Sequence, residues 1–155
     1  MKILLTLFLI LSGSLQFSAN QPNADVATET EVEEVVINFF EAMRESDSAG
    51  MQSILTVDAT LQTVAISEQE STVLNKTDIQ SFLSSVGESV PGALDEQITS
   101  FTAHVDGKLS TAWMEYRFYY DGEFSHCGVN TMNLIHTETG WKIFSIVDTR
   151  RQDPC

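Results

Sequence analysis

Seven residues in the C-terminal part of the chain have side chains that could bind or transform an organic molecule. Carboxylates and an imidazole can exchange protons, and guanidinium groups can hold an anion. An amide and an indole could orient a planar ligand or stack on it. The seven residues are Trp113, Glu115, Arg117, His126, Asn130, Asp148 and Arg150. They can act together only if the fold brings them to one place.

Turn signals between these residues predict an antiparallel meander. Asp106-Gly107 and Asp121-Gly122 each lie between runs rich in aromatic and β-branched residues. Asp-Gly favours the two-residue hairpin turn, and Glu138-Thr139-Gly140 supplies a third turn signal. The sequence therefore predicts four strands, over 97–105, 108–120, 123–137 and 141–151.

The turns also predict which residues share a face, because partners across a hairpin point to the same side of the sheet. We expect a two-residue turn at Asp121-Gly122 and a three-residue turn at 138–140. The resulting pairs are Trp113 with Asn130, Glu115 with Gly128, Arg117 with His126 and Asn130 with Asp148. All seven residues then gather at one end of one face, where Gly128 would leave room for a ligand.

Two functions are open for this polar end of the face. If it lines the interior of the fold, His126 with Asp148 or Glu115 could form a general acid/base pair. A carboxylate in apolar surroundings could also act alone with a raised pKa. If the face lies outside, the acids and arginines form a salt-bridged dimer interface. In either case the charges could simply neutralise one another.

The segments before the meander read mainly as helices. Thr30-x-x-Glu33 fits a capping box at the start of a helix that ends near Ser46. Apolar periodicity then predicts a short helix over 49–55, a strand over 58–67 and a helix over 75–87. Helices followed by a long meander predict an α+β fold in which the sheet packs on the helices.

The first residues have the pattern of a secretory signal peptide. Met1-Lys2 precedes an apolar run too short to span a bilayer, followed by small and polar residues up to Ala19. We expect a cleaved leader over 1–19, a flexible lead-in over 20–28 and one domain over 29–155. The protein would then be secreted or periplasmic.

Cys127 and Cys155 are the two cysteines of a chain expected in an oxidising compartment. Cys155 lies just beyond the last strand, which should pair with the strand that carries Cys127, so a disulfide would pin the C-terminal tail to the sheet. The alternative is a reactive thiol at Cys127 beside His126. Adjacent strand residues point to opposite faces, so His126 would not activate that thiol directly.

The charge balance argues against several classes of partner. With 22 acidic and 8 basic residues, the chain has a formal net charge of −14 and should repel nucleic acid and anionic membranes. No calcium loop, metal-ligand spacing, phosphate-binding glycine loop or nucleophile motif is present in the sequence. We therefore expect neither a metal nor a cofactor.

Four segments carry a resemblance to a known superfamily: Val36 to Met43, Asp47 to Leu55, Gly122 to Gly128 and Gly140 to Ile143. Over residues 30–151 the chain resembles the nuclear transport factor 2-like superfamily, closest to small exported bacterial proteins of the SnoaL-like and lumazine-binding-like groups. The resemblance implies a cone-shaped curved sheet wrapped on N-terminal helices, with a pocket inside and often a dimer outside. Members include isomerases, dehydratases, cyclases, epoxide hydrolases and non-enzymes, so it does not imply one activity.

These observations lead to three functional hypotheses. The first is an exported, homodimeric protein that binds a small organic ligand through Trp113, Asn130, Arg117 and Arg150, close to His126. The second is a cofactor-independent lyase or isomerase with Glu115, His126 or Asp148 as acid or base. The third is a non-catalytic dimerisation module, which a pocket filled by its own side chains would support.

Overall fold

The computed structural model describes residues 28–66, 71–152 and 155. The expected leader (1–19) and all but the last residue of the expected lead-in (20–28) lie outside the described residues. The helices are α1 (Glu29–Arg44), α2 (Ser48–Ile54) and α3 (Ile79–Gly87). The strands are β1 (Leu55–Ile66), β2 (Thr72–Thr77), β3 (Leu94–Asp106), β4 (Leu109–Tyr120), β5 (Glu123–Thr137) and β6 (Gly140–Thr149).

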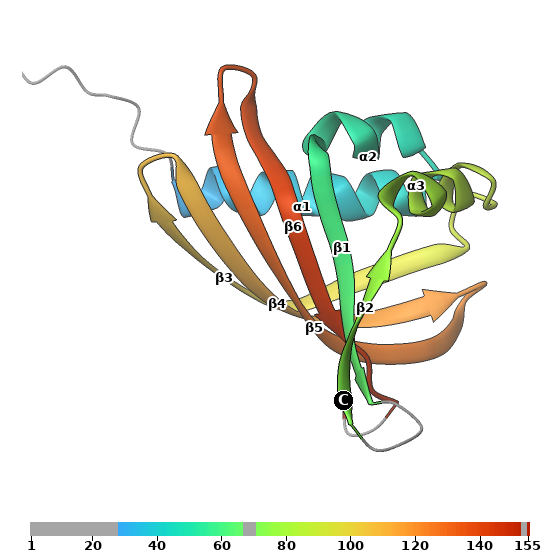
Figure 1. The fold of residues 1–155 in the computed structure, drawn as a ribbon. Coiled ribbons are helices and arrows are strands. Elements are labelled where there is room, and N and C mark those ends of the chain that lie inside the picture. Colours follow the sequence, from blue (N-terminus) through green and yellow to red (C-terminus); the bar gives the residue numbers. More distant parts are fainter. Residues whose placement is uncertain (1–27, 67–70, 153–154) are drawn as a thin grey trace, which may run out of the picture.

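One curved six-stranded sheet wraps around the helices, with α1 lying across its concave face (Figure 1). The strand order is β2-β1-β6-β5-β4-β3. Strands β3 to β6 form the antiparallel meander that the turn signals predict, so this prediction is confirmed. β1 adds to β6 in parallel, and β2 pairs antiparallel with β1 at the edge.

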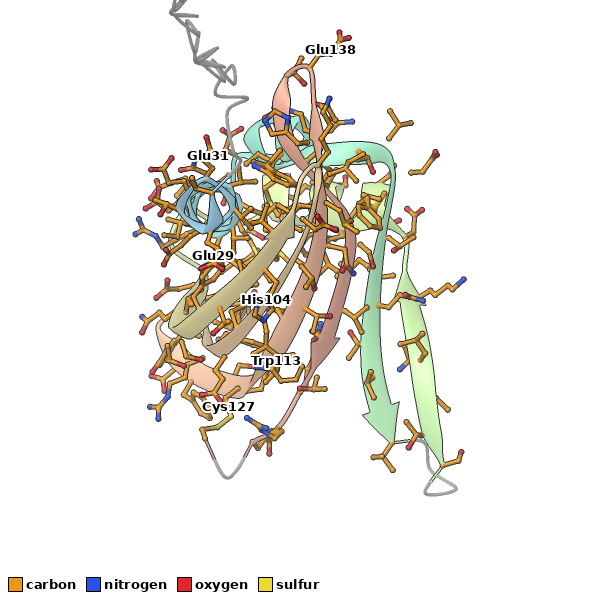
Figure 2. The ribbon with its side chains drawn as sticks, turned by 90° about the vertical axis from the view of Figure 1, so that its left-hand side faces the viewer. Glu29, Glu31, His104, Trp113, Cys127 and Glu138 are labelled. Carbon is orange, nitrogen blue, oxygen red and sulfur yellow. A yellow bond between two sulfur atoms is a disulfide. The ribbon has the colours of Figure 1, made fainter. Side chains whose placement is uncertain are left out.

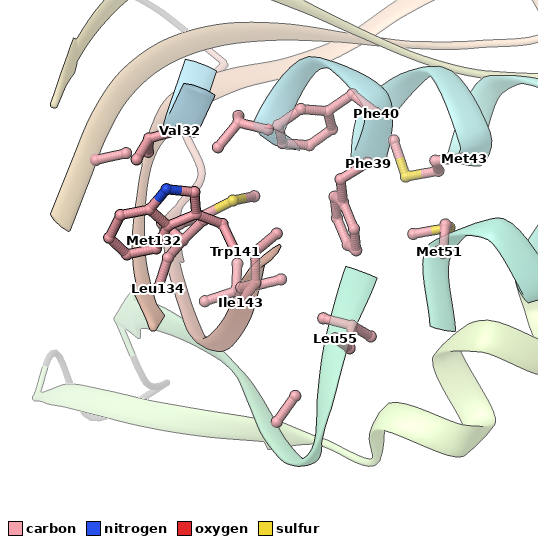
Figure 3. Close-up of a cluster of buried hydrophobic side chains, with 14 of the residues drawn as sticks. Val32, Phe39, Phe40, Met43, Met51, Leu55, Met132, Leu134, Trp141 and Ile143 are labelled. Atoms are coloured by element: carbon pink, nitrogen blue, oxygen red, sulfur yellow. The ribbon is translucent and has the colours of Figure 1, made fainter. Parts of the chain in front are cut away.

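A capping box starts α1, two residues earlier than the sequence pattern predicts. Glu31 N donates to Thr28 Oγ1 at 3.3 Å, and Thr28 N donates to Glu31 Oε2 at 2.8 Å. The helix then buries one apolar stripe against the sheet: Val32, Val36, Phe39, Phe40 and Met43. Figure 3 shows Phe39 and Phe40 in the same cluster as Met132, Leu134, Trp141 and Ile143 of β5 and β6.

The predicted helix over 75–87 is wrong in its first residues. Thr72–Thr77 forms strand β2, paired with β1, and α3 begins only at Ile79. Asp78 is the N-cap, because its Oδ2 accepts a hydrogen bond of 2.8 Å from Ser81 N. The cap fixes the helix start, and the residues before it remain free to extend the sheet.

The predicted register between β4 and β5 is also wrong, and a β-bulge is the reason. The two-residue turn is correct, since Tyr120 pairs with Glu123 and Tyr119 with Phe124. The register then shifts, so that Phe118 pairs with His126 and one residue of β5 is left without a partner. Beyond the bulge, each residue of β4 has a β5 partner that differs by one position from the predicted one. Its side chain therefore lies on the other face of the sheet from the side chains of β5 with which it was expected to meet.

Between β5 and β6 the predicted register holds where the site lies. Asn130 pairs with Asp148, as expected, and Met132 pairs with Ile146. Near the turn the pairs are displaced by one residue, with Thr137 opposite Gly140, and an irregularity near Asn133 and Leu134 restores the register. The same irregularity brings Trp141 and Ile143 into one core with Ile146.

The C-terminal tail is joined to β5. Cys127 and Cys155 form a disulfide, whose sulfurs lie at the lower end of the sheet in Figure 2, so neither cysteine is a free thiol. Cys127 also exchanges two backbone hydrogen bonds with Arg151, of 2.8 and 2.7 Å. These contacts fix the chain immediately after β6.

Candidate functional site

A cavity of about 240 Å³ lies between the helices and the concave face of the sheet. Most of its wall is apolar, from helices and strands alike: Phe39, Phe40, Met43, Leu61, Phe82, Leu94, Phe118, Met132 and Ile146. Its remaining wall is polar: Glu96, Tyr116, His126, Asn130, Asp148 and Arg150. An apolar chamber with a few convergent polar groups is the usual form of a small-molecule site.

Four of the seven residues singled out in the sequence line this cavity, namely His126, Asn130, Asp148 and Arg150. The other three, Trp113, Glu115 and Arg117, are exposed on the opposite face of the sheet, which we call the outer face. The prediction that all seven share one face is therefore wrong. The bulge after Phe124 causes the difference, because it turns the odd-numbered residues of β4 away from Asn130.

Glu96 is a polar residue of the cavity that sequence reasoning missed. The strand predicted from the sequence begins at residue 97, one residue after Glu96, so no cross-strand partner was predicted for Glu96. In the structure it pairs with Phe118, and Asn130 Nδ2 donates to its Oε1 at 2.6 Å. The available signal was an acidic residue between Leu94 and Ile98 in an alternating run, which places a carboxyl group on the apolar side of a strand.

The carboxyl group of Glu96 is poised to hold a proton. Burial raises the pKa of Glu96 to about 8, against the hydrogen bond from Asn130, which lowers it. The charge of Asp148 raises the pKa further, and that of Arg150 lowers it. Glu96 as a whole residue keeps some exposure, but its carboxyl group is held on the cavity side by Asn130. At neutral pH the group is therefore mostly a neutral carboxylic acid.

Asp148 holds Arg150 in place. Asp148 is buried, with 5% of the residue exposed, and both of its carboxylate oxygens accept a hydrogen bond. Thr63 Oγ1 donates to Oδ1 at 2.5 Å, and Arg150 Nε donates to Oδ2 at 2.8 Å. Asp148 consequently orients the guanidinium group.

His126 is held in its neutral form. Burial lowers the pKa of His126, the charge of Arg150 lowers it further, and that of Asp148 opposes them. Its Nδ1 lies 3.0 Å from Ser125 Oγ, so within the described part of the chain its hydrogen-bond partner is Ser125 rather than Asp148 or Glu115. The expected His–carboxylate pair is therefore absent from these contacts.

Gly128 makes room for the protein's own chain. A Cβ at this position would overlap the backbone oxygen of Thr149 and lie 2.9 Å from Tyr116 Cε1. The Tyr116 hydroxyl donates to that same oxygen at 2.9 Å. The expectation that Gly128 leaves space for a ligand is wrong, because β6 and the Tyr116 ring occupy the space.

Two further classes of site were sought in residues 28–66, 71–152 and 155. No group of three or more His, Cys, Asp or Glu side chains could hold a metal ion there. No helix within these ranges is long and apolar enough to cross a membrane.

The family comparison matches most of the chain. A family model described as a SnoaL-like domain matches residues 32–147. None of the curated proteins matches.

Solved structures share the fold at low sequence identity. An NTF2-like protein of unknown function from Shewanella baltica has a TM-score of 0.59 at 16% identity, covering 82% of this chain and 99% of its own. An NTF2-like protein with a cystatin-like fold from Novosphingobium aromaticivorans has a TM-score of 0.62 at 13% identity, covering 81% and 83%.

A third solved structure has a proposed activity. This protein, from Streptomyces avermitilis, is described as a candidate dehydratase of the NTF2-like family. Its TM-score is 0.60 at 19% identity, and the match covers 86% of this chain and 100% of the Streptomyces protein. At such identities the matches establish the fold, and the α+β cone expected from the sequence is confirmed.

Proposed function

The chain belongs to the SnoaL-like domain family, and from this premise we propose that it is an exported protein that binds a small organic ligand in its cavity. The observation that carries the proposal is the chamber of about 240 Å³, apolar over most of its wall and polar where Glu96, Asn130 and Arg150 meet. A chamber of this kind favours a ligand with an apolar body and one polar group.

Export is part of the proposal. The leader pattern over 1–19 and the disulfide between Cys127 and Cys155 both fit an oxidising compartment outside the cytoplasm. The mature protein would be the single domain over 29–155, preceded by residues 20–28. N-terminal sequencing of the protein recovered from the exported fraction tests the cleavage site.

Native mass spectrometry of the protein purified from its exported form tests ligand binding. A bound non-protein mass that is lost on denaturation supports the proposal. Leu94→Trp should reduce the bound fraction because Leu94 lines the cavity. Leu109→Trp is the matched control, since Leu109 is 52% exposed on β4 and should leave the bound mass unchanged. Equal occupancy in both variants would place the ligand elsewhere.

Glu96 favours a second candidate function, a cofactor-independent lyase or isomerase. Its raised pKa, about 8, gives comparable amounts of acid and carboxylate in mildly alkaline solution. The carboxylate could take a proton from a carbon next to a ligand carbonyl, leaving an enolate. The Glu96 acid could then return the proton to the same or a neighbouring carbon, with Arg150 stabilising the enolate oxygen.

Deuterium exchange into the enolisable ketone 2-tetralone, followed by NMR in D₂O, tests this second candidate without knowledge of the natural substrate. Exchange above the buffer rate should be abolished in Glu96→Gln, which keeps the acceptor for Asn130. Glu115→Gln removes an exposed carboxyl group from the outer face and should retain full exchange. Equal loss in both variants would contradict a role for Glu96.

Homodimer formation through the outer face completes the proposal. Leu109, Trp113 and Ile135 are large apolar residues that are 52%, 54% and 37% exposed there. A cavity filled by the protein's own side chains would have favoured dimerisation as the whole function. The cavity is open instead, so we propose dimerisation together with ligand binding.

A further inference from the structure

We propose that the ligand is an organic anion, a carboxylate carried on an apolar body, and that Arg150 recognises its charged group. The inference rests on the proposed function and narrows the class of ligand for the same cavity. Arg150 lines both this cavity and an open groove beside β1 and β2, where Thr63, Asn75 and Thr77 also lie. Its guanidinium group therefore stands between the chamber and the groove.

The hydrogen bonds of Arg150 leave its outer edge available. Nε donates to Asp148 Oδ2, and Thr63 fixes the other oxygen of the same carboxylate. Among the described residues no further partner of the guanidinium group is present, and the Arg150 side chain remains 56% exposed. The two terminal amino groups thus form a fork of donors, held in orientation by Asp148, whose geometry matches a carboxylate.

Among the residues that line the cavity, Arg150 is the one that carries a positive charge at neutral pH. Asp148 Oδ1 and Oδ2, Glu96 Oε1 and the Thr149 carbonyl oxygen each already accept one hydrogen bond from the protein. The Arg150 amino groups have no such partner among the described residues, and they are charged donors. A ligand whose polar group is an anion therefore gains more from this cavity than a neutral or cationic one.

The charges around Arg150 are compatible with an anion, although the whole chain carries −14. Asp148 and Arg150 offset each other at 2.8 Å. Burial keeps Glu96 largely protonated at neutral pH and keeps His126 largely uncharged. An entering carboxylate would consequently meet one oriented cation and no unpaired negative charge.

A matched pair of probes tests the inference. 2-Naphthoate and 2-naphthamide have nearly the same shape and differ in charge, and their affinities can be measured by isothermal titration calorimetry at pH 7. We expect the wild-type protein to bind naphthoate about 10- to 100-fold more tightly than naphthamide, the range for a hydrogen-bonded charge pair. Arg150→Gln should remove this preference, chiefly by weakening the binding of naphthoate.

Two further variants keep the test decisive. Arg117→Gln removes an arginine from the outer face and should retain the preference for naphthoate. Asp148→Asn combined with Arg150→Gln removes both charges together, which avoids an unpaired buried carboxylate if the single variant folds poorly. This double variant should bind naphthamide and show no preference for the anion.

The outcomes separate this inference from the proposed function. If both probes bind wild type equally, or if the preference survives in the Arg150 variants, the inference is wrong and the cavity remains a binding site. If neither probe binds at millimolar concentration, the chamber does not accept an apolar body of this size. That result would overturn the proposed function together with the inference.

Discussion

At the scale of single residues, Glu96 and Asn130 decide the chemistry of the cavity. One carboxyl group is buried beside an amide that donates to it, close to a second carboxylate and an arginine that bind each other. Burial first, and these neighbours second, set the pKa of Glu96 in the folded protein, and the stability of the protein should depend on pH accordingly.

Glu96 should make the folded protein less stable as the pH rises. Its pKa is about 8 in the folded state against a reference value of 4.5, so the folded state keeps a proton that the unfolded state releases. The free energy of unfolding should therefore fall between about pH 5 and pH 8, and the loss should level off above that range. At about 1.4 kcal/mol per pKa unit, we expect a loss on the order of 3–5 kcal/mol from this group.

Urea denaturation at pH 5, 7 and 9 measures the effect, and Glu96→Gln is the comparison that isolates it. The groups around Glu96 that also carry or change charge are Asp148, Arg150, His126 and Tyr116, and they are unchanged in the variant. The difference between wild type and Glu96→Gln should shift in favour of the variant with rising pH. A difference that is constant over this range would contradict a raised pKa.

At the scale of elements, the packing of β5 against β6 limits which residue can stand at position 128. Gly128→Ala should lower the free energy of unfolding by about 2–4 kcal/mol, because the new methyl group would overlap backbone and displace Tyr116. Thermal denaturation should compare Gly128→Ala with Gly87→Ala. At position 87 the new Cβ would lie 2.8 Å from the Ser48 hydroxyl oxygen, and this hydroxyl group can rotate away. Equal stability of the two variants would contradict the close approach of the strands.

The disulfide should stabilise the end of β6. It closes a segment with a sequence separation of 28, so the double variant Cys127→Ser with Cys155→Ser should be less stable by roughly 3 kcal/mol. Chemical denaturation of wild type with and without reductant gives an independent measurement. The double variant should be insensitive to reductant, and an unchanged wild type under reduction would argue against the bond.

The sequence predicts the elements of this fold well and their faces less well. Turn residues such as Asp121-Gly122 act locally, so the meander and its hairpins can be predicted from neighbours alone. The bulge beside Ser125 has no comparable local signal, and it reverses the face of Glu115 relative to Asn130. Four of the seven expected site residues line the cavity because β5 and β6 keep the predicted pairing of Asn130 with Asp148.

At the scale of the whole molecule, the outer face should bring two copies together. Sedimentation velocity of the purified protein should show a dimer, and Trp113→Glu should shift it to monomer by placing charge among exposed apolar side chains. Tyr120→Glu is the control, since Tyr120 is equally accessible, at 55% against 54%, but lies at the β4–β5 turn. A monomeric wild type, or a dimer that persists in Trp113→Glu, would contradict this assignment.

The parallel pairing of β1 with β6 also has a consequence for the order in which the chain can fold. Thr63 and Asp148, which meet across this pair, are separated by 85 residues. During synthesis the first strand has no partner on this side until the last strand has emerged, and non-local pairing of this kind is slow to form. Cys127 likewise cannot form its disulfide until Cys155, 28 positions later, has been made. The sheet should therefore close only after β6 has been made, a folding order compatible with the export proposed above.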